Sequence, residues 1–296
     1  MSISLDAALP EKRAARRAFD RARAFDDACF LHDEARSRLL ERLELVRLTP
    51  QVAIDLGCAT ARGANALAVR YPAARVLAVD SSGGMLRSAA GHARSGVSVL
   101  GGDAELLPLQ SHCADLVLAN LVLPWCRPDR LFAESARVLA EGGALLFATL
   151  GPDSLQEVRA AFGGVDDHIH VHAAFDMHDL GDLALAAGLA EPVLDVDRLE
   201  VTYADVAGLV RDLRGAGAVN VAGGRRRSLT GRERWRRFEA RLVPPEGRLA
   251  VTVELILGQA WGRGRVDREG GHGPRGGGEV LVPLDRIGRR FPSGNT

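Results

Sequence analysis

Polar groups with the chemistry to hold a nucleoside follow four short apolar runs in the first half of the chain. Asp80, at the end of the second run, offers a carboxylate that can accept hydrogen bonds from both hydroxyls of a ribose. Asp103, after the third run, can accept a hydrogen bond from an adenine amino group. In chain order the candidate binding residues are Asp55, Gly57, Ala59, Asp80, Ser81, Asp103, Ala104, Asn120 and Leu121. Their order predicts a nucleoside site built from the ends of neighbouring strands.

The segments that carry these residues are predicted to be strands of one sheet. Five runs are apolar on both faces, which is typical of a parallel sheet covered by helices on both sides, and they span 52–57, 75–80, 96–103, 115–120 and 144–149. Helical periodicity between them predicts helices over 63–71, 85–93 and 130–139. Glu141-Gly142-Gly143 is expected to stop the last helix before the fifth strand. Because ligands bind beyond the carboxyl ends of parallel strands, the candidate residues are expected at one edge of a doubly wound α/β fold.

The ends of the chain are expected to differ from this central domain. Residues 1–48 are predicted to be an N-terminal helical segment, with a break near 30–33 that indicates two helices. The domain itself is predicted over 49–262. Residues 263–296 are predicted to be a glycine-rich linker and tail, with one last short strand at 280–284.

The end of the central domain is predicted to add two antiparallel strands, at 193–203 and 249–257, after a helix at 179–188. Residues 204–247, between these strands, read as a helical insertion with helices at 205–214 and 232–242. The full expectation is a mostly parallel seven-stranded Rossmann-like sheet with N-terminal helices and an insertion between its last two strands.

Composition limits the partners and the compartment. The formal net charge is +0 at pH 7, so binding to nucleic acid through a bulk basic excess is not expected. The four cysteines form no CxxC pair, which favours free buried thiols in a reducing compartment over a zinc or redox site. No apolar run approaches the ~18 residues that span a membrane, and residues 1–10 lack a secretory pattern. These features predict a cytoplasmic protein that binds neither nucleic acid nor membrane.

A dinucleotide site is not indicated, because Ala59 stands at the second glycine of the G-x-G-x-x-G pattern. The chain instead resembles the class I S-adenosylmethionine-dependent methyltransferases over residues 52–149, through Asp55-x-Gly57, Asp80 and Asp103. The resemblance implies their Rossmann-like fold and S-adenosylmethionine as methyl donor, bound by the candidate residues named above. That family usually has glycine where Ala59 and Ala61 stand, so a methyl group at either place is expected to crowd the methionine part of the ligand.

A narrower resemblance covers about residues 13–262. It is carried by an ordered series of segments, which are Ala18-Phe19-Asp20-Arg21-Ala22, 120–126, 149–157, Asp179-Leu-Gly181, 212–220, Leu229-Thr230 and Gly258-Gln-Ala-Trp261. Together they resemble the malonyl-acyl-carrier-protein O-methyltransferases (BioC) of biotin synthesis. The resemblance implies methylation of the free carboxylate of a malonyl group that acyl carrier protein holds on phosphopantetheine. It places Phe25, where the family usually has tyrosine, with Trp125 and His172 on the substrate side.

The implied reaction needs no general base, because a carboxylate with a pKa near ~4 is already ionised at neutral pH. The enzyme has to align the carboxylate with the methyl donor and exclude water. The sequence accordingly identifies no catalytic residue. Candidates to grip the malonyl carboxylate are Arg21, Arg23 and the arginines of the insertion.

Seven arginines gather within residues 225–237 of the insertion, at positions Arg225, Arg226, Arg227, Arg232, Arg234, Arg236 and Arg237. Acyl carrier proteins are acidic as a family, so we expect the insertion to be a lid that docks the carrier through residues such as Arg226 and Arg236. The alternative is a solvated helix face with no partner.

Three alternating histidines, His168, His170 and His172, have His178 close behind them. In a strand they would share one face and could bind a metal, whereas in a loop one or two of them would contact substrate or backbone. We favour the loop and predict no metal.

Two other functions remain open at this point. The same segments resemble hydroxylases or assembly factors of respiratory complex I, which share the scaffold, and the histidines fit that reading. A degenerate, non-catalytic binding module would fit Ala59 and Ala61. Binding of S-adenosylmethionine and rescue of a biotin auxotroph would separate these hypotheses.

Overall fold

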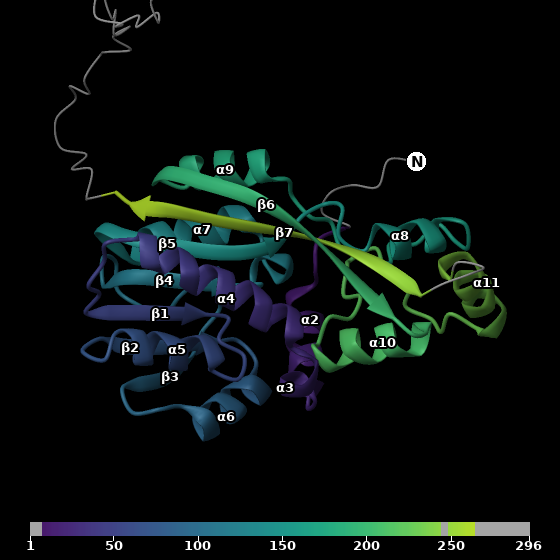
Figure 1. The fold of residues 1–296 in the computed structure, drawn as a ribbon, viewed down its shortest axis with the longest axis horizontal. Coiled ribbons are helices and arrows are strands. Elements are labelled where there is room, and N and C mark those ends of the chain that lie inside the picture. The colour runs from purple at the N-terminus through teal and green to yellow at the C-terminus, as the bar shows by residue number, and fades with distance from the viewer. Residues whose placement is uncertain (1–7, 244–247, 264–296) are drawn as a thin grey trace, which may run out of the picture. The chain divides into compact units, whose positions relative to one another are not determined.

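A seven-stranded sheet organises residues 8–243 and 248–263, which the computed structural model describes (Figure 1). The strands are β1 (Val52–Leu56), β2 (Arg75–Asp80), β3 (Val97–Gly101), β4 (Ala114–Asn120), β5 (Leu139–Leu150), β6 (Leu189–Tyr203) and β7 (Leu249–Gly262). Their order is β3-β2-β1-β4-β5-β7-β6. Strands β1 to β5 are parallel, and β7 is antiparallel to both β5 and β6. The predicted doubly wound, mostly parallel sheet is confirmed.

The order of the strands reverses between β1 and β4. The chain first runs outward from β1 to β3 and then crosses back to β4. Loops that leave β1 and β4 therefore turn to opposite faces of the sheet and open a crevice at the carboxyl ends of these strands. The candidate residues after β1, β2, β3 and β4 all belong to this edge.

Helices cover both faces of the sheet, because each carries an apolar stripe at helical spacing. On one face lie α4 (Phe30–Leu45), α5 (Arg62–Arg70) and α6 (Gly83–His92), which bury Leu39, Leu43 and Leu67. On the other lie α7 (Pro128–Val138) and α9 (Met177–Ala186), which bury Phe132 and Leu180. Burying one such side chain contributes roughly 1.5–3 kcal/mol, so the two layers hold the sheet rigid beneath the site.

The N-terminal segment breaks at other places than the periodicity predicts. The helices are α2 (Lys12–Arg21), α3 (Phe25–Ala28) and α4, and α4 runs unbroken through the predicted break at 30–33. The breaks fall at 22–24 and at Cys29. Ala22, Phe25 and Cys29 pack with Met85 of α6, so the chain turns to reach this cluster. Tertiary packing therefore sets the breaks. The break at Cys29 directly precedes the range of the predicted one, and the break at 22–24 is additional.

Strand β5 also begins earlier than predicted. It starts at Leu139, directly after α7, so the predicted helix stop at 141–143 lies inside the strand. The register with β4 shifts between Ala114 and Leu116, whose partners are Leu139 and Ala144. Gly142, with φ of 71°, allows the extra residues to form a bulge.

The two last strands extend past the rest of the sheet and carry the insertion (Figure 1). The insertion contains α10 (Val206–Gly215) and α11 (Arg232–Leu242), as predicted. Both pack with α8 (Gln156–Gly163) and β7 in an apolar cluster of their own, which includes Leu209, Phe238 and Val251. The predicted linker and strand beyond residue 263 lie outside the described residues. No helix among the described residues is long and apolar enough to cross a membrane.

Candidate active site

A cavity of about 370 Å³ opens at the carboxyl ends of β1, β2, β3 and β4, beneath α2. We call it the first cavity. Its lining includes eight of the nine predicted ligand-binding residues, namely Gly57, Ala59, Asp80, Ser81, Asp103, Ala104, Asn120 and Leu121. Phe25 and Trp125, predicted on the substrate side, line it too. The sheet therefore brings together residues that follow four successive strands of the sequence.

The loop after β1 is shaped by Gly57, whose φ is 72°. A Cβ at this position would lie 2.7 Å from Cγ2 of Val122 in the loop after β4. The backbone N–H groups of Gly57 and Cys58 both donate to the carbonyl of Val79. Only glycine satisfies both the backbone conformation and the close approach of the two loops.

Asp80 lies at the floor of the cavity and fixes this loop. Its Oδ2 accepts a hydrogen bond from the N–H of Ala59 at 3.0 Å, and its Oδ1 accepts one from the N–H of Ser82 at 2.8 Å. Burial raises the pKa of Asp80, and the backbone hydrogen bonds oppose that shift. A carboxylate has about four acceptor sites, so acceptor capacity remains for ribose hydroxyls.

Asp55, the ninth candidate, lies apart from the other eight. It does not line the first cavity, and its Oδ2 accepts a hydrogen bond from the N–H of Ala64 at 2.6 Å. A Cβ on Gly63 would lie 2.7 Å from the same oxygen. Burial raises the pKa of Asp55 to about 7. Asp55 therefore holds the start of α5, and its contact with a ligand stays a prediction.

The two alanines that replace family glycines differ in their surroundings. Both have positive φ, 46° at Ala59 and 66° at Ala61. Ala59 lines the first cavity, whereas Ala61 is wholly buried in the apolar layer that includes Leu67. The expected crowding therefore applies to Ala59 only, since the methyl group of Ala61 packs into the core.

His32 is a cavity residue that the sequence analysis missed. It lies in α4, lines the first cavity, and burial lowers its pKa to about 4. Its Nδ1 and the Oδ1 of Asn120 are buried without a hydrogen-bond partner in the described part of the chain. The Nδ2 of Asn120 donates to the carbonyl of His32 at 2.9 Å. A neutral histidine and an amide thus present two unpaired polar atoms where a ligand would sit.

Helix α2 covers the first cavity and is held at both ends. Near its start, Lys12 pairs with Asp103 and with Glu105, each at 2.7 Å. Near its end, Asp20 accepts hydrogen bonds from the Ser82 hydroxyl at 2.7 Å and the Gly84 N–H at 2.9 Å. Arg13 and Arg16 of α2 also line the cavity. The helix therefore brings positive charge to a site whose floor is acidic.

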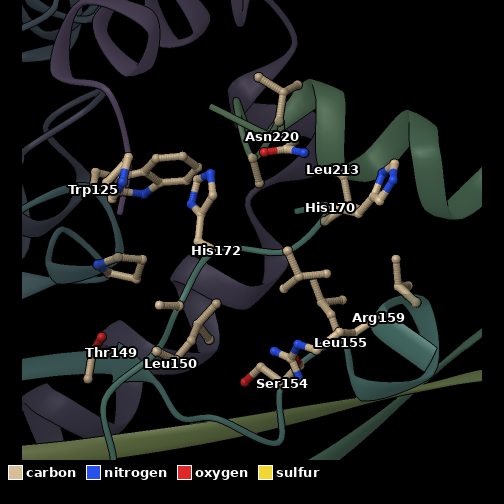
Figure 2. Close-up of a pocket in the computed structure, with 18 of the residues that line it drawn as sticks. Trp125, Thr149, Leu150, Ser154, Leu155, Arg159, His170, His172, Leu213 and Asn220 are labelled. Atoms are coloured by element: carbon tan, nitrogen blue, oxygen red, sulfur yellow. The ribbon is translucent and has the colours of Figure 1, made fainter. Parts of the chain in front are cut away.

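A second cavity, of about 420 Å³, lies beside the first (Figure 2). Its lining is mostly apolar and comes from α8, the insertion and the loop at 170–175. Trp125 and Cys126 line both cavities, so the two spaces meet at these residues. A ligand in the first cavity and a ligand in the second would face one another there.

Arg159 of α8 lines the second cavity, and the sequence analysis missed it as well. Its guanidinium donates to the carbonyls of Pro152 and Ser154 at 3.1 and 3.3 Å (Figure 2). No acidic side chain of residues 8–243 and 248–263 lines this cavity. The arginine therefore keeps a positive charge that suits an anion.

The histidines lie in a loop, as favoured, and not in a strand. His170 hydrogen bonds with Asp166 at 2.8 Å and stacks on Phe162 with centroids 3.6 Å apart. The Nε2 of His172 accepts the N–H of Val221 at 3.0 Å, and burial lowers the pKa of His172 to about 4. Both rings line the second cavity. The residues that the structure describes hold no group of three metal-ligating side chains.

Known proteins resemble this chain in sequence and in fold. Residues 54–147 match a family described as a methyltransferase domain. The chain is 43% identical to the malonyl-[acyl-carrier protein] O-methyltransferase of Methylovorus sp. (strain MP688), covering 88% of this chain and 92% of that one. It is 39% identical to the protein of the same name from Halorhodospira halophila, covering 96% and 98%. The chain belongs to the malonyl-[acyl-carrier protein] O-methyltransferase family.

Solved structures confirm the fold of this methyltransferase. The YcgJ protein from Bacillus subtilis superimposes with a TM-score of 0.56 at 18% identity, covering 77% of this chain and 98% of that one. A putative methyltransferase from Bacillus halodurans gives 0.54 at 18% identity, covering 77% and 99%. At such identities the likeness shows the fold alone.

The arginine-rich stretch of the methyltransferase is partly occupied by internal contacts. Arg225 and Arg227 both pair with Glu11, just before α2, and Arg237 pairs with Glu233. Arg226 and Arg236, the predicted docking residues, line neither cavity. Their role in docking stays a prediction.

Proposed function

We propose that this methyltransferase transfers a methyl group from S-adenosylmethionine to the free carboxylate of a malonyl thioester held by acyl carrier protein, at the start of biotin synthesis. The observation that carries the proposal is the meeting of two cavities at Trp125 and Cys126, one with nucleoside-binding groups and one mostly apolar with Arg159 on its wall. The names of the relatives support the same substrate.

The first cavity fits S-adenosylmethionine group by group. Asp80 can accept hydrogen bonds from the ribose hydroxyls. Asp103 can accept one from the adenine amino group while it also pairs with the Lys12 ammonium. The unpaired Oδ1 of Asn120 suits the ammonium of the methionine part. Arg13 and Arg16 suit its carboxylate. When bound, the cofactor supplies a methyl group on a positively charged sulfonium.

The second cavity fits a short acyl thioester that ends in a carboxylate. Apolar walls exclude water from the acyl chain, and the arginine guanidinium matches a carboxylate in charge and geometry. We assign Arg159 the role of gripping the malonyl carboxylate, in place of the candidates Arg21 and Arg23, which do not line this cavity. Among the candidate arginines of the insertion, Arg214 lines this cavity too.

No proton has to move in the proposed reaction, because the carboxylate is already ionised; its oxygen would gain the methyl group as the carbon–sulfur bond to the sulfonium breaks, with a neutral thioether as the leaving group. The residues contribute alignment and exclusion of water, which can supply roughly 7–11 kcal/mol at best. Burial lowers the pKa of His172 to about 4, so its imidazole is neutral near pH 7 and carries no extra proton to donate. The proposed reaction therefore needs no general base.

The test combines purified protein, S-adenosylmethionine and malonyl-acyl carrier protein, with the product followed by mass spectrometry. We expect one methyl ester per malonyl group and restored growth of a biotin auxotroph. Arg159→Gln is expected to lower kcat/KM by roughly 100-fold, as for loss of one partner of a charge pair, and Arg159→Lys to recover part of it. Absence of methyl ester with the wild-type protein would overturn the proposed function.

A further inference from the structure

A groove with four arginines adjoins the second cavity, and three of the four line neither cavity. Arg21 and Arg23 contribute one wall, at the end of α2 and just after it, and Arg211 and Arg214 of α10 contribute the other. All four side chains are exposed. We call this surface the arginine groove. It lies between the N-terminal helices and the insertion, two segments that are almost 200 residues apart in the chain. Figure 1 shows α10 beside α3.

Two glycines bring these walls together. A Cβ on Gly215 would lie 2.6 Å from the Cβ of Ala28 in α3. A Cβ on Gly217, whose φ is 72°, would lie 2.8 Å from the ring of Phe19 in α2. Because neither position tolerates a side chain, the end of α10 rests directly on α2 and α3. The backbone is thus built to hold the four arginines close to one another.

The charges of the groove are not neutralised within the described chain. None of its four arginines pairs with an acidic side chain of residues 8–243 and 248–263, and one acid, Glu239, lines the groove. The arginines at 225 and 227, by contrast, are bound to Glu11. Gathering like charges costs free energy, which a bound anionic partner would offset.

The arginine groove is continuous with the second cavity. Val210, Arg214 and Trp235 line both. A ligand with its acyl end in the second cavity and its arm leaving the protein here would pass Arg214 first and then the other three arginines. Such a ligand needs a negatively charged group at the mouth and more negative charge outside it.

We propose that the arginine groove is where the acidic carrier protein docks, with Arg214 at the phosphodiester of its arm and Arg21, Arg23 and Arg211 at acidic side chains. This rests on the proposed function, and it moves docking from Arg226 and Arg236 to the junction of α10 with α2. The groove selects the carrier-bound thioester over one without phosphate or protein.

The test compares two substrates, malonyl-carrier protein and a malonyl thioester of a short thiol that bears neither phosphate nor protein. The variant is Arg23→Glu/Arg211→Glu, with one change on each wall and neither residue in the second cavity. The control is Arg47→Glu/Arg94→Glu, two exposed arginines that precede the amino ends of β1 and β3, at the opposite edge of the sheet.

We expect the groove variant to raise KM for malonyl-carrier protein at least roughly tenfold, with kcat within about twofold, because rim charges act on encounter and affinity. Its kcat/KM on the short thioester should equal that of the wild type, and the control should change neither. The wild-type KM for the carrier should rise with salt, and that of the variant should rise less. An unchanged KM for the carrier, or equal losses on both substrates, would overturn the docking site. Failure of the wild type to methylate either substrate would instead refute the proposed function.

Discussion

Trp125 packs edge-on against His172, with ring centroids 5.2 Å apart and planes at 88°. Phe19 of α2 also contacts this indole edge-on, with ring centroids 5.0 Å apart and planes at 87°. The indole of Trp125, which lines both cavities, therefore contacts the helix that covers the first cavity and the loop that lines the second. The contact with His172 depends on an uncharged imidazole, and the contact with Phe19 depends on the position of α2.

The pH dependence of stability tests the His172 contact. Burial lowers the pKa of His172 to about 4, and the charge of Arg225 lowers it further. The unfolded chain takes up this proton near pH 6.5 and the folded chain near 4, so stability is lost as pH falls through this range. We expect the unfolding free energies of the wild type and His172→Gln to approach one another by about 1–2 kcal/mol between pH 7 and pH 5.

Urea denaturation at the two pH values measures this difference. The comparison cancels His32 and Asp55, whose pKa values of about 4 and about 7 shift stability in opposite directions in both proteins. A constant gap between the two proteins would show that His172 has the same pKa in the folded and the unfolded chain, and would contradict the lowered pKa.

Asp80 is predicted to dominate cofactor affinity. Asp80→Asn keeps one acceptor but removes the charge and one of the oxygens that hold Ala59 and Ser82. We expect the Kd for S-adenosylmethionine to rise at least tenfold, since a hydrogen bond to a charged group is worth about 1.5–3 kcal/mol. Asp103→Asn should have the smaller effect, because that side chain is 43% exposed and already paired with Lys12. Titration calorimetry on both variants decides, and equal losses would contradict the assignment.

The two strained alanines make a matched pair. Ala59→Gly and Ala61→Gly each relieve a left-handed alanine, worth about 1–2 kcal/mol, against a loss of about 0.4–1 kcal/mol from the freer unfolded chain. We expect both variants to stay within about 1 kcal/mol of the wild type in stability. Only Ala59→Gly should bind S-adenosylmethionine more tightly, by up to about tenfold, because Ala59 alone lines the first cavity. Tighter binding by Ala61→Gly instead would refute this reading.

Lys12 and Glu105 are predicted to be energetically coupled. The carboxylate of Glu105 is 2% exposed and lies 2.7 Å from the Lys12 ammonium. In Lys12→Met the same carboxylate still lies 3.8 Å from the guanidinium of Arg130. We expect a loss of about 1–2 kcal/mol, below the value for a fully buried pair because Lys12 is 43% exposed. In a double-mutant cycle, Glu105→Gln should recover most of it, and additive losses would show that the pair is not coupled.

Much of the site could be predicted because its residues follow strands with a clear apolar pattern. Asp80, Asp103 and Asn120 occupy the expected edge, since the carboxyl ends of parallel strands meet there. The pattern could not show that Asp55, at an equivalent strand end, turns toward α5 and does not line the first cavity. That direction depends on which face of the strand meets a helix.

Residues of helices were harder to assign. His32 and Arg159 lie in helices whose periodicity identifies an apolar stripe but not the space beside it. Their roles depend on cavities formed by elements that are distant in sequence. A buried, unpaired Nδ1 or a guanidinium without an acid is visible only once neighbours are in place.

The strand that begins at Val52, and the order of acids after it, follow from the sequence because strand, helix and turn preferences are local. Tertiary structure decided where the two cavities meet and which arginines face them. Arg225 and Arg227 pair with Glu11. Arg211 and Arg214 line the same groove as Arg21 and Arg23. Gly215 and Gly217 allow this, because they let the end of α10 approach α2 and α3 closely. Such contacts join segments at opposite ends of the chain, and packing, not local spacing, sets their geometry.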